Sequence, residues 1–157
     1  MRSDRPSMPT GYGIAPGEDG TLEWSWVERQ CTKARNYWIC TTRPDFRPHA
    51  IPVWGLWLEG AVVFSTDPHS TKARNFSARP DAVIHLESGD EVVILEGRIE
   101  PMDPALMPEF VKRYEKKYSF RPSESEAAGV YALRPHRVLA WREKNFPTSA
   151  TRFTAQS

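Results

Sequence analysis

The sequence lacks long apolar segments and an excess of charge of either sign, and these absences exclude two kinds of partner. No apolar run in the 157 residues approaches the roughly 20 residues that a membrane-spanning helix requires. The 21 Lys and Arg side chains are balanced by 20 Asp and Glu side chains, which leaves a net charge of +1. We therefore expect neither a membrane nor a nucleic acid as partner, and any basic site must be local.

Cysteine is also scarce. Cys31 and Cys40 are the only two, and they indicate neither a disulfide framework nor a paired zinc motif. We interpret both as free thiols of a protein in the reducing cytoplasm. The four histidines do not stand at metal-ligand spacing with one another, with cysteine or with carboxylates. The sequence therefore predicts no metal site.

The common catalytic signatures are missing as well. The chain has no GxSxG motif, and neither cysteine stands beside an evident base. It has no GxGxxG motif and no regular alternation of strands with helices, which argues against a Rossmann-type fold. We therefore assign no catalytic residue.

The sequence does contain many short β-branched and aromatic segments separated by turn signals. Strands are expected at 37–42, 49–58, 61–66, 82–88, 91–100, 129–135 and 136–143, and helices at 21–36, 68–79 and 103–120, before an irregular tail over 144–157. This pattern favours a mainly β fold, an antiparallel β-barrel with peripheral helices, and a β-sandwich is the alternative. Residues 1–20 are rich in Pro and Gly and predict a flexible N-terminal arm, so that 21–157 form a single domain.

The segment STDPHSTKARNF, residues 65–76, places hydroxyl groups and cations where a strand leads into a helix. Its candidate side chains are Ser65, Thr66, Ser70, Thr71, Lys72 and Arg74. A lysine in the first turn of a helix is unfavourable by about 0.3 to 1 kcal/mol, because it meets the positive end of the helix dipole. A bound anion reverses that sign, so the segment predicts a phosphate site. An ordinary capped surface helix is the alternative.

The segment HAIPVWGLW, residues 49–57, predicts a second part of the same site. Pro52, Trp54 and Gly55 indicate a flat apolar wall with accessible backbone, which suits a planar aromatic ligand. His49 opens this strand and is a candidate for the mouth of the pocket. The alternative is that the tryptophans belong to the core, above all Trp57. A planar ring beside a phosphate site is typical of a flavin-like nucleotide.

Residues 34–97 resemble the pyridoxamine 5'-phosphate oxidase-like, FMN-binding split-barrel superfamily, and within it the branch with deazaflavin (coenzyme F-420) dependent oxidoreductases. The shared pattern is a turn of the RPDGRPH kind, PVW, a strand ending in FST, S-x-K-A-R-N and HLESGDEVV. In this sequence Phe46 stands where the turn usually carries glycine.

The resemblance implies a split β-barrel that forms a homodimer, with two cofactor sites at the subunit interface. It implies that the cofactor phosphate is held by Ser65, Thr66, Ser70, Thr71 and Lys72, and that the ring lies against Pro52, Val53 and Trp54. His49 and Arg74 are further candidates, and Trp141 is a candidate to close the site from the partner subunit.

The function that this implies is an oxidoreductase that transfers a hydride between reduced F-420 and a small organic acceptor. In this scheme the cofactor supplies the redox chemistry and the protein supplies binding and orientation. An FMN-dependent oxidoreductase is the first alternative. A protein that binds flavin or deazaflavin without turnover is the second, and a dimer with a vestigial site is the third. The sequence does not identify the acceptor.

Overall fold

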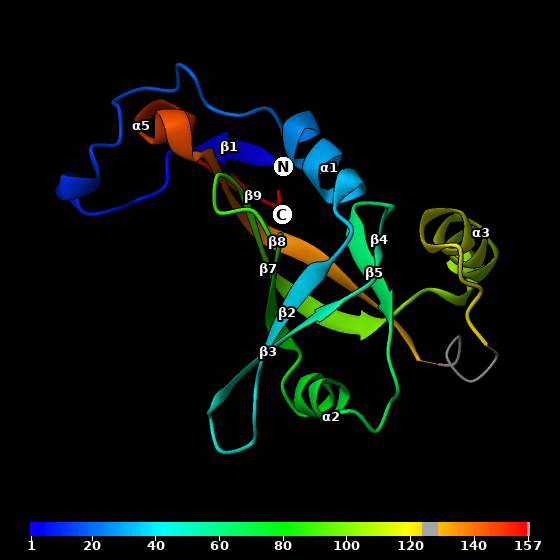
Figure 1. Cartoon of the computed structure of the whole chain (residues 1–157). Helices are drawn as coiled ribbons and strands as arrows, with labels where there is room; N and C mark the ends of the chain where they lie inside the picture. Colours follow the sequence, from blue (N-terminus) through cyan, green and yellow to red (C-terminus); the bar gives the residue numbers. More distant parts are fainter. Residues whose placement is uncertain (124–128, 157) are drawn as a thin grey trace.

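The chain folds around one curved antiparallel sheet, shown by a computed structural model that describes residues 1–123 and 129–156 (Figure 1). The strands are β1 Arg2–Asp4, β2 Tyr37–Thr42, β3 Pro48–Val53, β4 Leu56–Leu58, β5 Ala61–Ser65, β6 Asp81–His85, β7 Glu91–Pro101, β8 Val130–Arg142 and β9 Thr151–Thr154. The helices are α1 Trp24–Lys33, α2 Thr71–Ala78, α3 Met107–Tyr118 and α5 Phe146–Ser149, with short 3-10 turns η1 Thr10–Tyr12, η2 Pro104–Leu106 and η3 Glu143–Asn145.

The order of the strands explains why the sheet curls without closing. Its main path runs β1-β9-β8-β7-β6-β2-β3, and β5 pairs with both β8 and β4. All of these pairings are antiparallel. In the described part of the chain β3 and β4 do not pair with each other, although they follow one another in sequence. The prediction of a mainly β, antiparallel split barrel with peripheral helices is therefore confirmed.

The segment expected to form one strand over 49–58 is divided into β3 and β4. β3 pairs with β2, whereas β4 turns away and pairs with β5. The change of partner occurs at Trp54 and Gly55, and a Cβ at Gly55 would lie 2.8 Å from the Val63 carbonyl oxygen. Only glycine permits this close approach of the two backbones.

The two strands expected over 129–143 are one continuous strand, β8. The Pro135-His136 pair, which suggests a break, lies where β8 carries one extra residue opposite the Glu96–Gly97 step of β7. A proline cannot donate a ladder hydrogen bond, and a β-bulge accommodates it without ending the strand.

Both ends of the chain are more ordered in structure than the sequence predicts. The tail expected to be irregular contains η3, α5 and β9, and β9 pairs with β8 on one side and β1 on the other. The start of the predicted arm is thus part of the sheet. The Arg5 side chain donates to the Gly17 and Asp19 carbonyls of the arm and to the Thr148 carbonyl near the C-terminus. The arm therefore lies against the domain.

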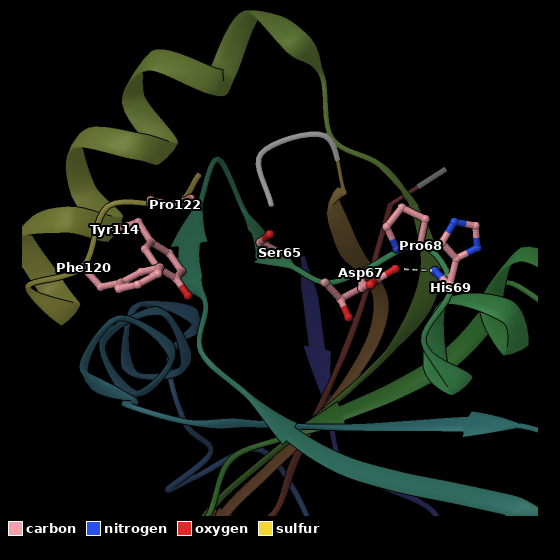
Figure 2. A pocket seen from close by; sticks show the side chains of 8 residues that line it. Ser65, Asp67, Pro68, His69, Tyr114, Phe120 and Pro122 are labelled. Carbon is pink, nitrogen blue, oxygen red and sulfur yellow. Dashed lines mark hydrogen bonds between the residues drawn. The ribbon is translucent and has the colours of Figure 1, made fainter. Parts of the chain in front are cut away.

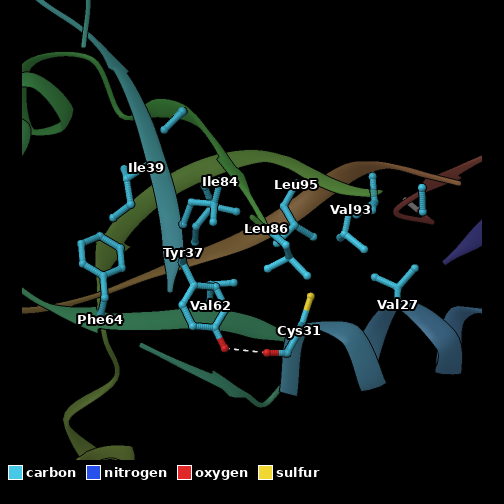
Figure 3. Close-up of a cluster of buried hydrophobic side chains, with 14 of the residues drawn as sticks. Val27, Cys31, Tyr37, Ile39, Val62, Phe64, Ile84, Leu86, Val93 and Leu95 are labelled. Atoms are coloured by element: carbon cyan, nitrogen blue, oxygen red, sulfur yellow. Dashed lines mark hydrogen bonds between the residues drawn. The ribbon is translucent and has the colours of Figure 1, made fainter. Parts of the chain in front are cut away.

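The main core lies between helix α1 and the concave side of the sheet (Figure 3). Val27 and Cys31 of α1 and Tyr37 and Ile39 of β2 are completely buried. Burying a side chain of this size contributes about 1.5 to 3 kcal/mol, so this packing fixes α1 on the sheet. The Tyr37 hydroxyl donates to the Cys31 carbonyl at 2.5 Å, which satisfies the one polar group in this layer of the core.

A second apolar cluster fixes α3 beside β4 and β5. Phe110, Tyr114 and Tyr118 of α3 share one face at four-residue spacing and are buried against Leu58 and Val63. Neither this helix nor any other in the described part of the chain is long and apolar enough to cross a membrane.

Candidate functional site

Five residues separate the end of β5 from the start of helix α2, whose first turn is built by local hydrogen bonds. Ser70 is the N-cap, and its hydroxyl oxygen accepts from the Ala73 amide at 3.3 Å. The Thr66 and Ser70 hydroxyl oxygens lie 3.2 Å apart, so the strand end is tied to the cap. The amides of Thr71 and Lys72 have no hydrogen-bond acceptor within residues 1–123 and 129–156, as the helix geometry dictates.

Lys72 brings a positive charge to these free amides. The side chain is half-buried, and no carboxylate in the described part of the chain forms an ion pair with it. Burial lowers the pKa of the Lys72 ammonium below its usual value, and the negative charge of Asp67 raises it in part. No acidic residue in the first turn of α2 compensates this charge. The arrangement is that of a site for an external anion.

His49 of β3 lies beside this helix end. It stands opposite Thr41 in the ladder, and the Thr41 hydroxyl accepts a hydrogen bond from the Asn75 side chain of α2. The His49 Nδ1 is buried and has no hydrogen-bond partner in the described structure. Burial, then Arg43, then Lys72 lower the pKa of His49 below its usual value. A buried ring nitrogen without a partner, close to two cations, indicates a place for an anionic or hydrogen-bonding ligand.

A first cavity, of about 520 Å³, opens between this helix end and α3 (Figure 2). One side is polar and comes from the end of β5 and the loop that follows it, whereas the other side is largely aromatic. The lining residues are Ser65, Thr66, Asp67, Pro68, His69, Tyr114, Phe120 and Pro122. The cavity can therefore receive a ligand with one polar side and one flat apolar side.

A second cavity, of about 380 Å³, lies against the first turn of α2 and is basic. Its lining residues are Arg43, Pro44, Asp45, Arg47, Thr71, Arg74 and Asn75. The Arg47 guanidinium is paired with Asp45 at 2.8 Å, so Arg43 and Arg74 provide the uncompensated charge. The first turn of α2 thus has a space for a ligand on either side.

Phe46 lies at the tip of the β2–β3 hairpin beside the second cavity. Its backbone has φ +66°, in the left-handed region that favours glycine, which explains why the related turns carry glycine there. The exposed ring lies 4.6 Å from the Arg79 guanidinium carbon. Arg79 also donates to the Arg43 carbonyl, so the Phe46 ring packs on a cation that is itself bound to the turn.

The expected flat wall is only partly open. Trp54 is 37% exposed, but its ring stacks on Tyr118 with centroids 4.7 Å apart and planes 6° apart. Phe120 of the first cavity meets the same indole edge to face at 6.4 Å. Val53 lies on the same side of β3 as His49, whereas Pro52 projects to the opposite, exposed side. A ligand on this strand would meet Val53 and Trp54, and only the backbone of Pro52.

The structure brings together most of the predicted residues. Ser65 and Thr66 line the first cavity, Thr71 and Arg74 line the second, and Ser70 and Lys72 stand in the turn between them. Along β3, Val53 lies about 13 Å from His49, so the two ends of the strand suit an elongated ligand. Trp57 packs against the main core, which agrees with the alternative prediction that this tryptophan is a core residue.

Trp141 does not lie at this site within one chain. It is near the end of β8, eleven residues beyond Val130, which pairs with Ser65. Its indole N–H donates to Glu143, and its ring meets Phe146 edge to face. A role for Trp141 from a partner subunit stays a prediction.

Sequence reasoning missed Arg43, Tyr118 and Phe120. Arg43 belongs to a turn whose sequence predicts only an exposed loop. It reaches the site because the β2–β3 hairpin packs beside α2. Tyr118 continues the four-residue spacing of Phe110 and Tyr114, which was the one available signal, whereas Phe120 lies beyond the end of α3 and had none.

The donors at the end of β5 and the start of α2 fit a phosphate group. Two free amides and the side chains of Thr71 and Lys72 belong to the first turn of α2, and oxygen anions accept hydrogen bonds from all of these groups. The described residues contain no group of three potential metal ligands. The donors of this helix end are therefore suited to an anion.

Comparison with solved structures shows that the fold is shared with known proteins. An F420 reductase is 20% identical over 71% of this chain and 94% of its own, with a TM-score of 0.58. A conserved hypothetical protein of Mycobacterium tuberculosis is 18% identical over 87% and 91%, with a TM-score of 0.68. A heme binding protein of Mycobacterium smegmatis is 20% identical over 90% of this chain and 59% of its own, with a TM-score of 0.61.

None of the curated proteins matches the sequence. Residues 27–142, which are most of the chain, match the family described as pyridoxamine 5'-phosphate oxidase. This chain therefore belongs to the pyridoxamine 5'-phosphate oxidase family, which binds flavin-type cofactors and includes oxidoreductases.

Proposed function

We propose that this protein is an oxidoreductase that binds coenzyme F-420 and transfers a hydride between the reduced deazaflavin and a small organic acceptor. The observation that carries the proposal is Lys72, a half-buried cation with no ion pair in the described structure, at a helix N-terminus between two cavities. In a family that binds flavin-type cofactors, the phosphate of the cofactor is the anion that this position suits.

The residues have different tasks in this proposal. Ser70, Thr71 and Lys72 hold the phosphate, and Ser65 and Thr66 complete the cradle from the strand end. Val53 and Trp54 face the ring of the cofactor, and His49 contacts the part of the cofactor between its ring and its phosphate. The cofactor supplies the hydride chemistry when it is bound, so the chain needs to provide binding, orientation and exclusion of water.

The second cavity favours F-420 over FMN. FMN ends at its phosphate, whereas F-420 carries further acidic groups beyond it. Arg43 and Arg74 beside the first turn of α2 would receive such groups. FMN remains the second candidate cofactor, because the donors in the first turn of α2 would be sufficient to bind its phosphate.

We also propose that the protein acts as a homodimer in the cytoplasm. Two features support the dimer: no described strand pairs with the outer edge of β3, and Ile51 and Trp54 are exposed there. An unpaired edge with exposed apolar side chains is normally covered. The two free cysteines are in keeping with a reducing compartment.

Spectroscopic titration with F-420 and with FMN, followed by a turnover assay, tests this function. We expect F-420 to bind at micromolar concentration, and its reduced form to be oxidised in the presence of a member of a panel of quinones and enones. Binding of FMN in place of F-420 would move the assignment to the FMN-dependent alternative. No binding of either cofactor would refute the proposal.

A second candidate is a protein that binds a cofactor without turnover. It is favoured by the likeness of fold to a heme binding protein. The panel therefore includes tetrapyrroles. Tight binding of a flavin, a deazaflavin or a tetrapyrrole, with no oxidation of reduced cofactor above background, would support this candidate.

A further inference from the structure

Tyr118 and Lys117, at the end of α3, satisfy the backbone of the β3–β4 break. The Tyr118 hydroxyl accepts from the Gly55 amide at 2.9 Å and lies 2.7 and 2.8 Å from the carbonyl oxygens of Arg35 and Gly55. The neighbouring Lys117 ammonium also donates to the Gly55 carbonyl, at 2.9 Å. Both polar backbone groups of Gly55 thus depend on α3, because neither ladder extends to this residue.

The Tyr118 ring orients the side chain that precedes Gly55. It lies parallel to the Trp54 indole at 4.7 Å, and the Arg35 guanidinium carbon is 5.4 Å from the centre of the same indole. The face of Trp54 that meets Tyr118 is therefore unavailable to a ligand. The exposed remainder adjoins Phe120, which is 44% exposed and lines the first cavity.

The contacts around Trp54 hold its side chain in place without burying it. Trp54 and Phe120 are among the few large apolar side chains that the described chain leaves exposed, yet Trp54 is fixed by a stack and by the backbone on its C-terminal side. A rigid, exposed aromatic surface beside a cavity is a preorganised surface for a flat ligand.

We infer that Tyr118 is a positioning residue for the ring end of the cofactor site: its ring sets the orientation of Trp54, and its hydroxyl sets the backbone at Gly55. This inference rests on the proposed function, because it names the residue that aligns the ring once the phosphate is held at α2. It makes α3 part of the site, although helices α2 and α3 lie on opposite sides of the first cavity (Figure 2).

The test compares Tyr118→Phe, which keeps the ring and loses the hydroxyl, with Tyr118→Leu, which loses both. Tyr131→Phe is the matched control, because the Tyr131 ring packs on Phe64 and Phe76 and its hydroxyl makes no hydrogen bond to Trp54 or Gly55 in the described structure. Each variant is titrated with F-420 and FMN, and with inorganic phosphate as a probe of the anchor alone. 5-Fluorotryptophan labelling reports the Trp54 environment in the cofactor-free protein, with the resonance assigned through Trp54→Phe.

We expect Tyr118→Phe to weaken cofactor binding about tenfold, the effect of losing one well-placed hydrogen bond, and Tyr118→Leu to weaken it further. Phosphate binding should stay unchanged, the Trp54 resonance should shift, and Tyr131→Phe should behave like the wild type. Unchanged cofactor affinity in Tyr118→Phe would overturn the inference while the proposed function stands. An equal loss of phosphate affinity would overturn it too, because it would show general loosening. A wild-type protein that binds neither cofactor would refute the proposed function itself.

Discussion

His49 on β3 and Lys72 on α2 lie at one end of the site, where burial, then the charge of Arg43 and then that of Lys72 lower the pKa of His49. Two cations held beside a histidine raise the free energy of the site, and an anion between them would lower it. The site is thus poised for a negatively charged ligand.

The first prediction concerns the protonation of His49. An anion bound at α2 attracts a proton, so inorganic phosphate or F-420 should raise the His49 pKa, and affinity should increase as the pH falls through it. Lys72→Ala should also raise this pKa in the ligand-free protein. NMR titration of the histidine ring measures both effects, with exposed His136 as the internal reference. A His49 pKa that neither change moves would show that the residue is remote from the site.

The second prediction concerns Lys117. Burial lowers the pKa of its ammonium to about 8, from an ordinary value of 10.5. Between these values the unfolded chain binds more protons than the folded one, so the contribution of Lys117 to the free energy of unfolding increases with pH. Burial raises the pKa of the Cys31 thiol to about 12, from an ordinary value of 9.0. Above pH 9 the unfolded chain therefore loses this proton before the folded one, and the contribution of Cys31 lowers the free energy of unfolding as the pH rises. The contribution of Lys117 is therefore best measured between pH 8 and pH 9.

Chemical denaturation at pH 7, 8 and 9 measures this effect. Lys117→Met should remove the increase across the window, whereas the control Lys116→Met, an exposed residue one position away, should keep it. Identical pH profiles for the wild type and Lys117→Met would contradict the assignment.

The third prediction concerns the β3–β4 break. Gly55→Ala should lower the free energy of unfolding by about 1 to 3 kcal/mol, because the new Cβ would lie 2.8 Å from the Val63 carbonyl oxygen. Gly89→Ala is the control, since a Cβ there meets nothing within 4 Å. Thermal unfolding of both variants gives the comparison. Equal stability would mean that the break is not constrained at Gly55.

The parts of the fold that the sequence predicts are those that local patterning determines. β2 was predicted over 37–42 because this segment is rich in β-branched and aromatic residues, and in the structure these residues alternate between buried and half-buried positions. The division of 49–58 was not predicted, because it depends on the approach of Val63. The continuity of β8 was not predicted either, since it depends on a bulge opposite β7. Such features arise between segments and leave no local signal.

The same distinction applies to the site. Ser70 and Lys72 could be identified because a cap and a misplaced charge are properties of one helix end. Arg43 comes from a distant hairpin, so nothing in the α2 segment points to it. Tyr118 shares a helix face with Phe110 and Tyr114, but its place at the site depends on how α3 packs beside Gly55. The orientation of Pro52 away from Val53 follows from strand alternation, but only once the bounds of β3 are known.

The fourth prediction tests the central claim, that the first turn of α2 holds the phosphate of the cofactor. The measurement is calorimetric titration of F-420 into the wild type and Lys72→Ala, with exposed Lys112→Ala as control. Loss of a charge-assisted hydrogen bond costs about 1.5 to 3 kcal/mol, so Lys72→Ala should bind roughly ten- to a hundredfold more weakly. The ligand-free variant should be as stable as the wild type or slightly more stable, since a cation leaves the positive end of the helix dipole. Equal affinity of Lys72→Ala and the wild type for F-420 would contradict the account.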